Sequence, residues 1–191
     1  ERCRCRIEHE LLNSDFYIFG WRQVPVNPKV LGQKANDTRP EIEQIIFACD
    51  KKYDFQELER KLFVIRKKIE KKASKEQLND FYISSLSSKS VIYKGMFLAE
   101  NIADFYPDLL DSRFKSRFAL FHQRFSTNTF PSWELAQPFR IIAHNGEINT
   151  IKGNVNWMKT HEAGFESELF ENVDDIKPII KANNSDTASL D

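Results

Sequence analysis

The sequence predicts an α+β fold with layered sheets. Two segments, 54–69 and 148–158, carry apolar residues at alternating steps of three and four, which is the period of a helix with one buried face. Short aromatic and β-branched runs lie between turn residues, as is typical of strands. These runs do not alternate strictly with helices, so a wholly parallel α/β sheet is not expected.

The composition is that of one globular domain. The chain has 191 residues, 41% of them apolar, with sixteen Phe to fill a core. Its 28 basic and 28 acidic residues cancel, which argues against a general nucleic-acid or anionic-membrane binder. No apolar run approaches the ~20 residues of a membrane span. Cys3, Cys5 and Cys49 lack the spacing of a disulfide framework or zinc site, so a reducing compartment such as cytosol or an organelle matrix is expected.

The first part of the chain is predicted to contain two helices and two strands. Residues 2–13 are expected to be helical, and strands are expected at 15–21 and, after a loop rich in Pro and Gly, at 41–49. Asp54 begins the clearest helix, since Glu57 completes a capping-box pattern. The opposite face of this helix is basic. A nucleic-acid surface is one interpretation, but a solvated face is the commoner cause of such a run.

The second part is predicted to contain a hairpin, a short helix, two buried strands and a second clear helix. In chain order these are expected at 80–86 with 90–97, 101–110 with a break at Pro107, 118–121, 139–143 and 148–158. A short helix is expected in 174–180, and a helix start in 185–191. Both buried strands end in polar residues, which would bring those residues to one edge of a sheet.

Asn145 and Gly146 are the first candidates for a functional site at this edge. They lie between the second buried strand and the helix that follows, where backbone N–H groups are unpaired. The N–H of Gly146 and the side-chain amide of Asn145 would together hold a developing oxyanion, which indicates acyl transfer. An Asn-Gly pair is otherwise most often a simple turn.

Arg124 and Asp186 add complementary charges. The guanidinium of Arg124 can bind a carboxylate through two hydrogen bonds, and Asp186 could accept from an ammonium group. Together with Asn145 and Gly146 as two donors for an amide oxygen, Arg124 and Asp186 would form a site for glutamine. The alternatives are a surface ion pair for Arg124 and a helix cap for Asp186. A nucleophile is not evident, because Ser126 and Thr127 have only His122 as a base and no carboxylate to orient it.

Three strings resemble the class II, N-terminal-nucleophile glutamine amidotransferase domain of glutamate synthases: HQRFSTNTFP, LAQPFR and AHNGEINTIKGN. Three further strings stand in the order expected of that family: GWRQVPVN at 20–27, YKGMF at 93–97 and NNSDTASLD at 183–191. The resemblance covers essentially the whole chain. It implies a four-layer αββα N-terminal-nucleophile (Ntn) hydrolase fold.

The resemblance also implies roles for particular residues. Arg124 would bind the glutamine carboxylate, with Thr127 contributing to the same subsite. Asn145 and Gly146 would form the oxyanion hole, and Asp186 would hold the α-amino group. These roles agree with those argued from the chemistry of the side chains.

The nucleophile of this family is a cysteine at the mature N-terminus, activated by its own α-amine. Glu1 occupies the first position here, and neither Cys3 nor Cys5 stands in a matching context. We therefore expect residues 1–191 to be a partial domain, truncated at both ends, without its N-terminal strands and inactive by itself.

The resemblance implies that the parent protein releases ammonia from L-glutamine and uses it to convert 2-oxoglutarate to L-glutamate. No cofactor is expected in this chain. For the parent protein we expect two cofactors, flavin mononucleotide (FMN) and a 3Fe-4S cluster. We also expect an electron donor, either ferredoxin or NAD(P)H, the latter through a small subunit. The parent is expected in the cytoplasm or the plastid stroma. The alternatives are another class II glutamine amidotransferase and a glutamine-sensing module without a nucleophile.

Overall fold

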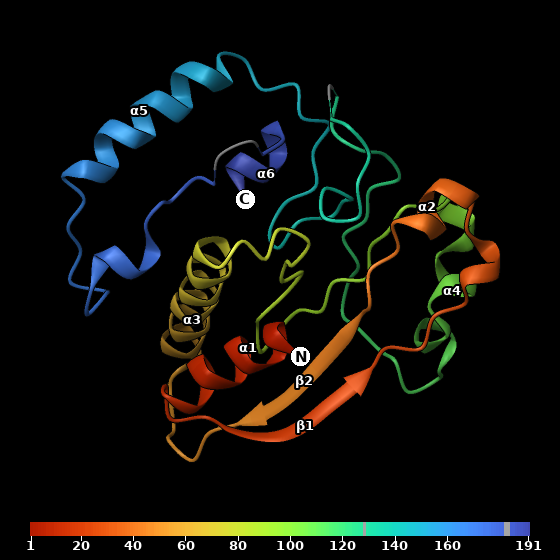
Figure 1. Ribbon diagram of the computed structural model, residues 1–191, viewed down its shortest axis with the longest axis horizontal. Helices are drawn as coiled ribbons and strands as arrows, with labels where there is room; N and C mark the ends of the chain where they lie inside the picture. The colour runs from red at the N-terminus through yellow and green to blue at the C-terminus, as the bar shows by residue number, and fades with distance from the viewer. Residues whose placement is uncertain (128, 182–183) are drawn as a thin grey trace. The chain divides into compact units, whose positions relative to one another are not determined.

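The computed structural model describes residues 1–127, 129–181 and 184–191. The chain forms two compact units: unit 1 comprises Glu1–Gly20, Ile45–Val91 and Asn149–Asn183, and unit 2 comprises Trp21–Gln44, Ile92–Ile148 and Asn184–Asp191. Strands β1 (Tyr17–Gln23) and β2 (Glu43–Ala48) run antiparallel in a two-stranded sheet (Figure 1). None of the helices in the described part of the chain is long and apolar enough to cross a membrane.

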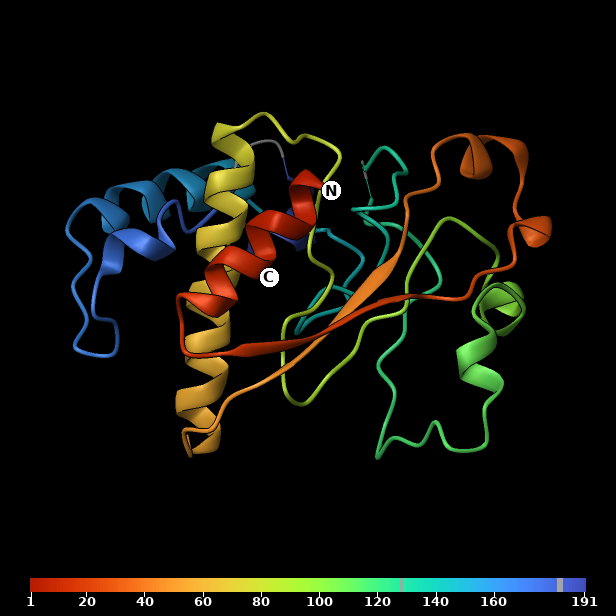
Figure 2. The ribbon, with the colours of Figure 1, turned by 60° about the horizontal axis from the view of Figure 1, so that its bottom comes forward.

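Unit 1 is built around two packed helices, α1 (Arg2–Leu12) and α3 (Phe55–Lys75), which lie side by side in Figure 2. The apolar stripe of α3 faces α1, and the core residues they enclose are Leu11, Phe16, Leu62, Ile65 and Ile69. The predicted capping box of α3 is confirmed: Asp54 Oδ1 accepts from the Glu57 N–H at 2.8 Å, and Glu57 Oε2 accepts from the Asp54 N–H at 3.2 Å. Unit 1 also contains α5 (Ile151–Ala163) and the 3-10 turn η4 (Val173–Ile176).

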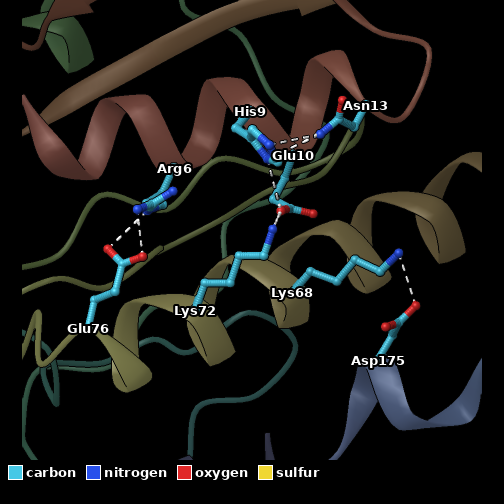
Figure 3. A network of polar contacts seen from close by, with 8 residues as sticks. All are labelled: Arg6, His9, Glu10, Asn13, Lys68, Lys72, Glu76 and Asp175. Carbon is cyan, nitrogen blue, oxygen red and sulfur yellow. Dashed lines mark hydrogen bonds and ion pairs between the residues drawn. The ribbon is translucent and has the colours of Figure 1, made fainter.

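Acidic side chains and backbone carbonyls of unit 1 contact the basic face of α3, and Figure 3 shows two of the ion pairs, Lys68 with Asp175 and Lys72 with Glu10. Lys68 Nζ lies 2.9 Å from the Asp175 carboxylate, and Lys72 forms an ion pair with Glu10. Further contacts join Lys61 to Asp15, Lys67 to the carbonyl of Pro178 and Lys71 to the carbonyl of Asp174. Cations that are paired in this way leave little net charge for a phosphate backbone. The face therefore serves packing within the unit, which disfavours the nucleic-acid interpretation.

Unit 2 contains short helices around an aromatic core. These elements are η1 (Pro28–Val30), α2 (Gln33–Asp37), η2 (Ala99–Asn101), α4 (Ile102–Phe105), η3 (Pro107–Leu110) and α6 (Asp186–Leu190). The break expected near Pro107 separates α4 from η3 at Tyr106. Phe105 is fully buried, with the rings of Phe97 and Trp133 at 5.1 and 5.7 Å. The Trp133 indole donates to the Ala35 carbonyl at 3.0 Å, which ties α2 to this core.

The predicted hairpin at 80–86 and 90–97 is wrong, because neither run is a strand. Its intended turn is attached to α3 instead. Ser87 Oγ donates to Glu59 Oε2 at 2.8 Å, and Ser88 donates to Glu59 Oε1 through both its N–H and its hydroxyl. The Glu59 carboxylate of α3 thus accepts hydrogen bonds from the residues that were predicted to form the turn of the hairpin.

The predicted buried strands at 118–121 and 139–143 are also wrong. Phe118 and Phe121 are 81% and 75% exposed, and no described segment pairs with them. The second run turns instead of extending, since the Phe139 N–H donates to the Ile142 carbonyl at 2.9 Å. A strand exists only where a second strand takes its backbone groups. The described residues are α+β as predicted, with helices and one two-stranded sheet, and the layered arrangement remains a prediction.

Candidate functional site

The candidate site lies within unit 2, where hydrogen bonds join three segments that are far apart in the sequence. The Thr127 N–H donates to the Asn145 carbonyl at 2.6 Å, which joins the segment after residue 121 to the Asn-Gly pair. The hydroxyls of Ser126 and Thr187 lie 2.7 Å apart, which brings in the first turn of α6. The segments that carry Arg124, Asn145 and Asp186 are therefore held together by hydrogen bonds, and not by the strands expected from the sequence.

A buried polar cluster anchors these segments. Gln137 binds both backbone polar groups of His144: its Oε1 accepts from the His144 N–H at 2.8 Å, and its Nε2 donates to the His144 carbonyl at 2.7 Å. Thr187 Oγ1, which is fully buried, donates to the same carbonyl at 3.1 Å. Buried polar groups bonded in this way specify one arrangement, because any shift leaves a group unpaired. The cluster fixes the backbone immediately before Asn145.

Gly146 occupies a position that only glycine fits. Its φ is +83°, and a Cβ there would lie 2.4 Å from the Cβ of Ser126. The Gly146 N–H donates to His144 Nδ1 at 2.9 Å. Helix α5 begins at Ile151 after Thr150, so the expectation that Gly146 lies at a helix N-terminus is wrong. Its N–H is held by an imidazole and must exchange that bond to receive a ligand.

Asn145 is exposed, and its side chain is held by one contact. Its Oδ1 lies 3.0 Å from His122 Nε2. On the other side of the same ring, His122 Nδ1 accepts from the Arg124 N–H at 3.1 Å. Among the described residues, His122 makes no hydrogen bond with Ser126, whose hydroxyl is bonded to Thr187 and Gln137. A Ser126–His122 nucleophile pair is therefore wrong.

The three predicted substrate-binding side chains differ in their surroundings. Arg124 is exposed, and its guanidinium makes no hydrogen bond or ion pair with another described residue. Asp186 is the first residue of α6, but the cap is Ser185, whose Oγ accepts from the Ala188 N–H at 3.3 Å. Thr127 is exposed, with its hydroxyl 3.4 Å from Glu147. The helix-cap alternative for Asp186 is thus wrong.

Comparison with known families now decides the class of this chain. The profile of the class II glutamine amidotransferases matches residues 1–191. The chain belongs to the class II glutamine amidotransferases. Membership of this family implies an N-terminal-nucleophile fold.

Named relatives of this amidotransferase chain are glutamate synthases. It is 59% identical to the "Glutamate synthase [NADPH] large chain" of Azospirillum brasilense over all of this chain and 13% of that protein. It is 49% identical to the protein of the same name from Bacillus subtilis, over 91% of this chain and 12% of the relative. It is 44% identical to the "Ferredoxin-dependent glutamate synthase" of Pyropia yezoensis, over 97% of this chain and 12% of the relative. The chain thus spans about an eighth of the length of these relatives.

Sequence reasoning missed the side chains that join the segments of the candidate site. Gln137, His144 and Thr187 were not among the predicted site residues, although each stands inside a family-like string. Their role depends on bonds between segments 7 to 61 residues apart, which no local pattern signals. Their place inside the strings that resemble the family was the one available hint.

No metal or cofactor chemistry is assigned to the described residues of the amidotransferase chain. Among them, no group of three or more His, Cys, Asp or Glu side chains could hold a metal ion. Cys3, Cys5 and Cys49 are free thiols. A set of ligands for an iron–sulfur cluster is therefore not found among these residues.

An open pocket of about 600 Å³ in unit 2 is mainly apolar, although Gln33, Lys34 and Asn101 also line it. Val30, Met96, Phe97, Leu98 and Phe125 give it an apolar lining. A free amino acid carries a carboxylate and an ammonium group, and burying either without a partner is costly. This pocket therefore offers few polar partners to the charged groups of a free amino acid.

Lys94 is a buried cation of unit 2. Its Nζ donates to the Glu134 carbonyl at 2.6 Å and lies 5.0 Å from the centre of the Phe139 ring. Burial, and secondarily the charge of Arg140, lower the pKa of Lys94 from 10.5 to about 8. Charging Lys94 therefore costs the folded state free energy at neutral pH.

This cost predicts a pH-dependent stability. The unfolded chain binds the Lys94 proton more tightly than the folded chain does. The free energy of unfolding is therefore lowered by the full amount below pH 8, and it rises as the pH increases from about 8 to 10.5. At 1.36 kcal/mol per pH unit, the wild type should gain about 3 kcal/mol over this range relative to Lys94→Met. Amide exchange of peptides from residues 92–97 in the full-length protein would measure it. A difference between the two proteins that does not change with pH would contradict the prediction.

Proposed function

We propose that this chain forms the glutamine-binding part of a glutaminase site in a glutamate synthase. The observation that carries the proposal is that hydrogen bonds join the segments of Arg124, Asn145 and Asp186. Thr127 is bonded to Asn145, and Ser126 is bonded to Thr187. Family membership and the names of the relatives support the same conclusion.

The proposed substrate is L-glutamine. Arg124 would bind its α-carboxylate through two charge-assisted hydrogen bonds, with Thr127 in the same subsite. Asp186 would accept from the α-ammonium group. The side-chain amide of Asn145 and the N–H of Gly146 would donate to the side-chain carbonyl oxygen as it gains negative charge.

The proposed chemistry is acyl transfer to a cysteine thiolate outside residues 1–191. The sulfur forms a bond to the amide carbon, and the carbonyl electron pair moves to the oxygen held by Asn145 and Gly146. When that pair returns, the carbon–nitrogen bond breaks, and the nitrogen takes a proton and leaves as ammonia. Water then cleaves the thioester to glutamate. To receive the oxyanion, Gly146 must release the imidazole of His144.

The finer features of the parent protein are part of the proposal. The chain would be a partial four-layer αββα domain, inactive until the nucleophile and the remaining strands are present. The released ammonia would serve the reductive amination of 2-oxoglutarate, with FMN and a 3Fe-4S cluster in other regions. The electron donor stays open between ferredoxin and a nicotinamide cofactor, since the relatives include both types by name.

The test is ammonia release from L-glutamine by the full-length protein that contains this chain. We expect hydrolysis that is lost when the N-terminal residue of the mature protein is replaced. A mature N-terminal residue other than cysteine, with glutamine bound but not hydrolysed, would favour the glutamine-sensing module instead. Hydrolysis without synthesis of glutamate from 2-oxoglutarate would favour another class II amidotransferase.

Asp186→Ala should chiefly weaken glutamine binding. Loss of a hydrogen-bonded partner for a charged group costs roughly 1.5–3 kcal/mol, so KM should rise about tenfold to a hundredfold while kcat changes little. The matched control is Asp104→Ala, because Asp104 is an exposed carboxylate in α4 of the same unit. Steady-state kinetics with L-glutamine would measure both. An unchanged KM in Asp186→Ala would remove Asp186 from the site.

A further inference from the structure

His122 makes two hydrogen bonds that connect both halves of the proposed site. Its Nδ1 accepts from the Arg124 N–H at 3.1 Å, and its Nε2 lies 3.0 Å from Asn145 Oδ1. One ring therefore contacts the backbone of the residue proposed for the substrate carboxylate and the side chain proposed for the oxyanion. The proposed reaction assigns no role to His122.

These contacts define where the ring proton lies. A neutral imidazole carries one N–H, and the nitrogen that accepts a hydrogen bond cannot be the protonated one. Because Nδ1 accepts from the Arg124 backbone, the proton lies on Nε2. His122 Nε2–H then donates to Asn145 Oδ1.

This donation also fixes the side chain of Asn145. An amide can rotate by half a turn and exchange its oxygen for its NH₂ group. With Oδ1 held by the His122 ring, the exchanged orientation would place two donors against each other. Asn145 Nδ2 makes no hydrogen bond within the described residues, so it remains available as a donor.

We propose that His122 is a positioning residue that orients the Asn145 amide so that its NH₂ group faces the developing oxyanion. The proposal rests on the proposed glutaminase function. His122 would act through Asn145 and would not transfer a proton itself. A donor held in place before the reaction is worth more than one that must first reorient, which gives His122 an effect on rate and little effect on glutamine affinity.

The test compares His122→Gln with His122→Asn in the full-length protein. The Gln amide nitrogen can reach the position of Nε2, whereas the shorter Asn amide reaches only the position of Nδ1. We expect His122→Gln to hydrolyse glutamine within about threefold of the wild-type kcat. His122→Asn should lose about tenfold to a hundredfold in kcat, with KM changed less than about threefold. The local control is Gln123→Ala, because Gln123 is an exposed neighbour.

A double-mutant cycle separates this inference from the proposed function. If His122 acts through Asn145, His122→Asn should cost nothing further in an Asn145→Ala background. Equal losses in His122→Gln and His122→Asn, or losses that add to that of Asn145→Ala, would overturn the positioning role. If Asn145→Ala itself leaves glutamine hydrolysis unchanged, the proposed oxyanion hole fails instead.

Discussion

Gly146→Ala is expected to abolish glutamine hydrolysis and to loosen the site. A left-handed φ of +83° costs an alanine roughly 1–2 kcal/mol, and its Cβ would lie 2.4 Å from the Cβ of Ser126. Relief of this overlap costs roughly another 1–3 kcal/mol. Ser126 must move, and it is bonded to Thr187 and Gln137, so buried polar groups would lose partners.

The measurement combines glutaminase kinetics with amide exchange of peptides from residues 122–127 and 144–148. We expect faster exchange in both segments of the full-length variant together with the loss of activity. Gly153→Ala is the matched control, because the nearest atom to its added Cβ is 4.0 Å away and the residue lies within helix α5. That change should stabilise α5 by about 0.5–1 kcal/mol. Normal activity in Gly146→Ala would show that the backbone here is not held as described.

Asn145→Ala is expected to lower kcat for glutamine hydrolysis by roughly a hundredfold to a thousandfold, which is the usual cost of removing one oxyanion donor. KM should change little, because the bond strengthens as charge develops and contributes less to the bound substrate. Fold stability should be nearly unaffected, since the Asn145 side chain is exposed and bonded to the His122 ring at the surface, and the bond to Thr127 is made by the backbone carbonyl.

Asn156→Ala, an exposed asparagine in α5, is the control for this change. Single-turnover measurement of ammonia release would separate chemistry from product release. A rise in KM with unchanged kcat would assign Asn145 to ground-state binding and remove it from the oxyanion hole.

Local patterns in the sequence predicted the helices well. The stripe and capping box of 54–69 became α3, and residues 2–13 and 148–158 correspond to α1 and α5 within a few residues. Helical hydrogen bonds join residues four apart, so the information lies within one window of sequence. Strands β1 and β2 were predicted because aromatic and β-branched runs were bounded by turn residues.

The strands predicted at 118–121 and 139–143 failed for a physical reason. Their composition is suitable, but a strand forms only when a distant segment supplies its hydrogen-bond partners. In the second run, the carboxylate of Asp191 takes the Ile141 N–H at 3.1 Å and pairs with Arg140 at 2.7 Å. A side chain fifty residues away thus replaces the neighbour that a strand would need.

The sequence by itself determined the family of this chain, most of its helices, and the residue types suited to bind glutamine. The tertiary structure alone decided how those residues are held. It showed that Gln137 and Thr187 bind the backbone of His144, that Ser126 excludes any side chain at position 146, and that the His122 ring contacts the side chain of Asn145. These relations are hydrogen bonds and close contacts between distant segments, whose partners are chosen only when the chain folds.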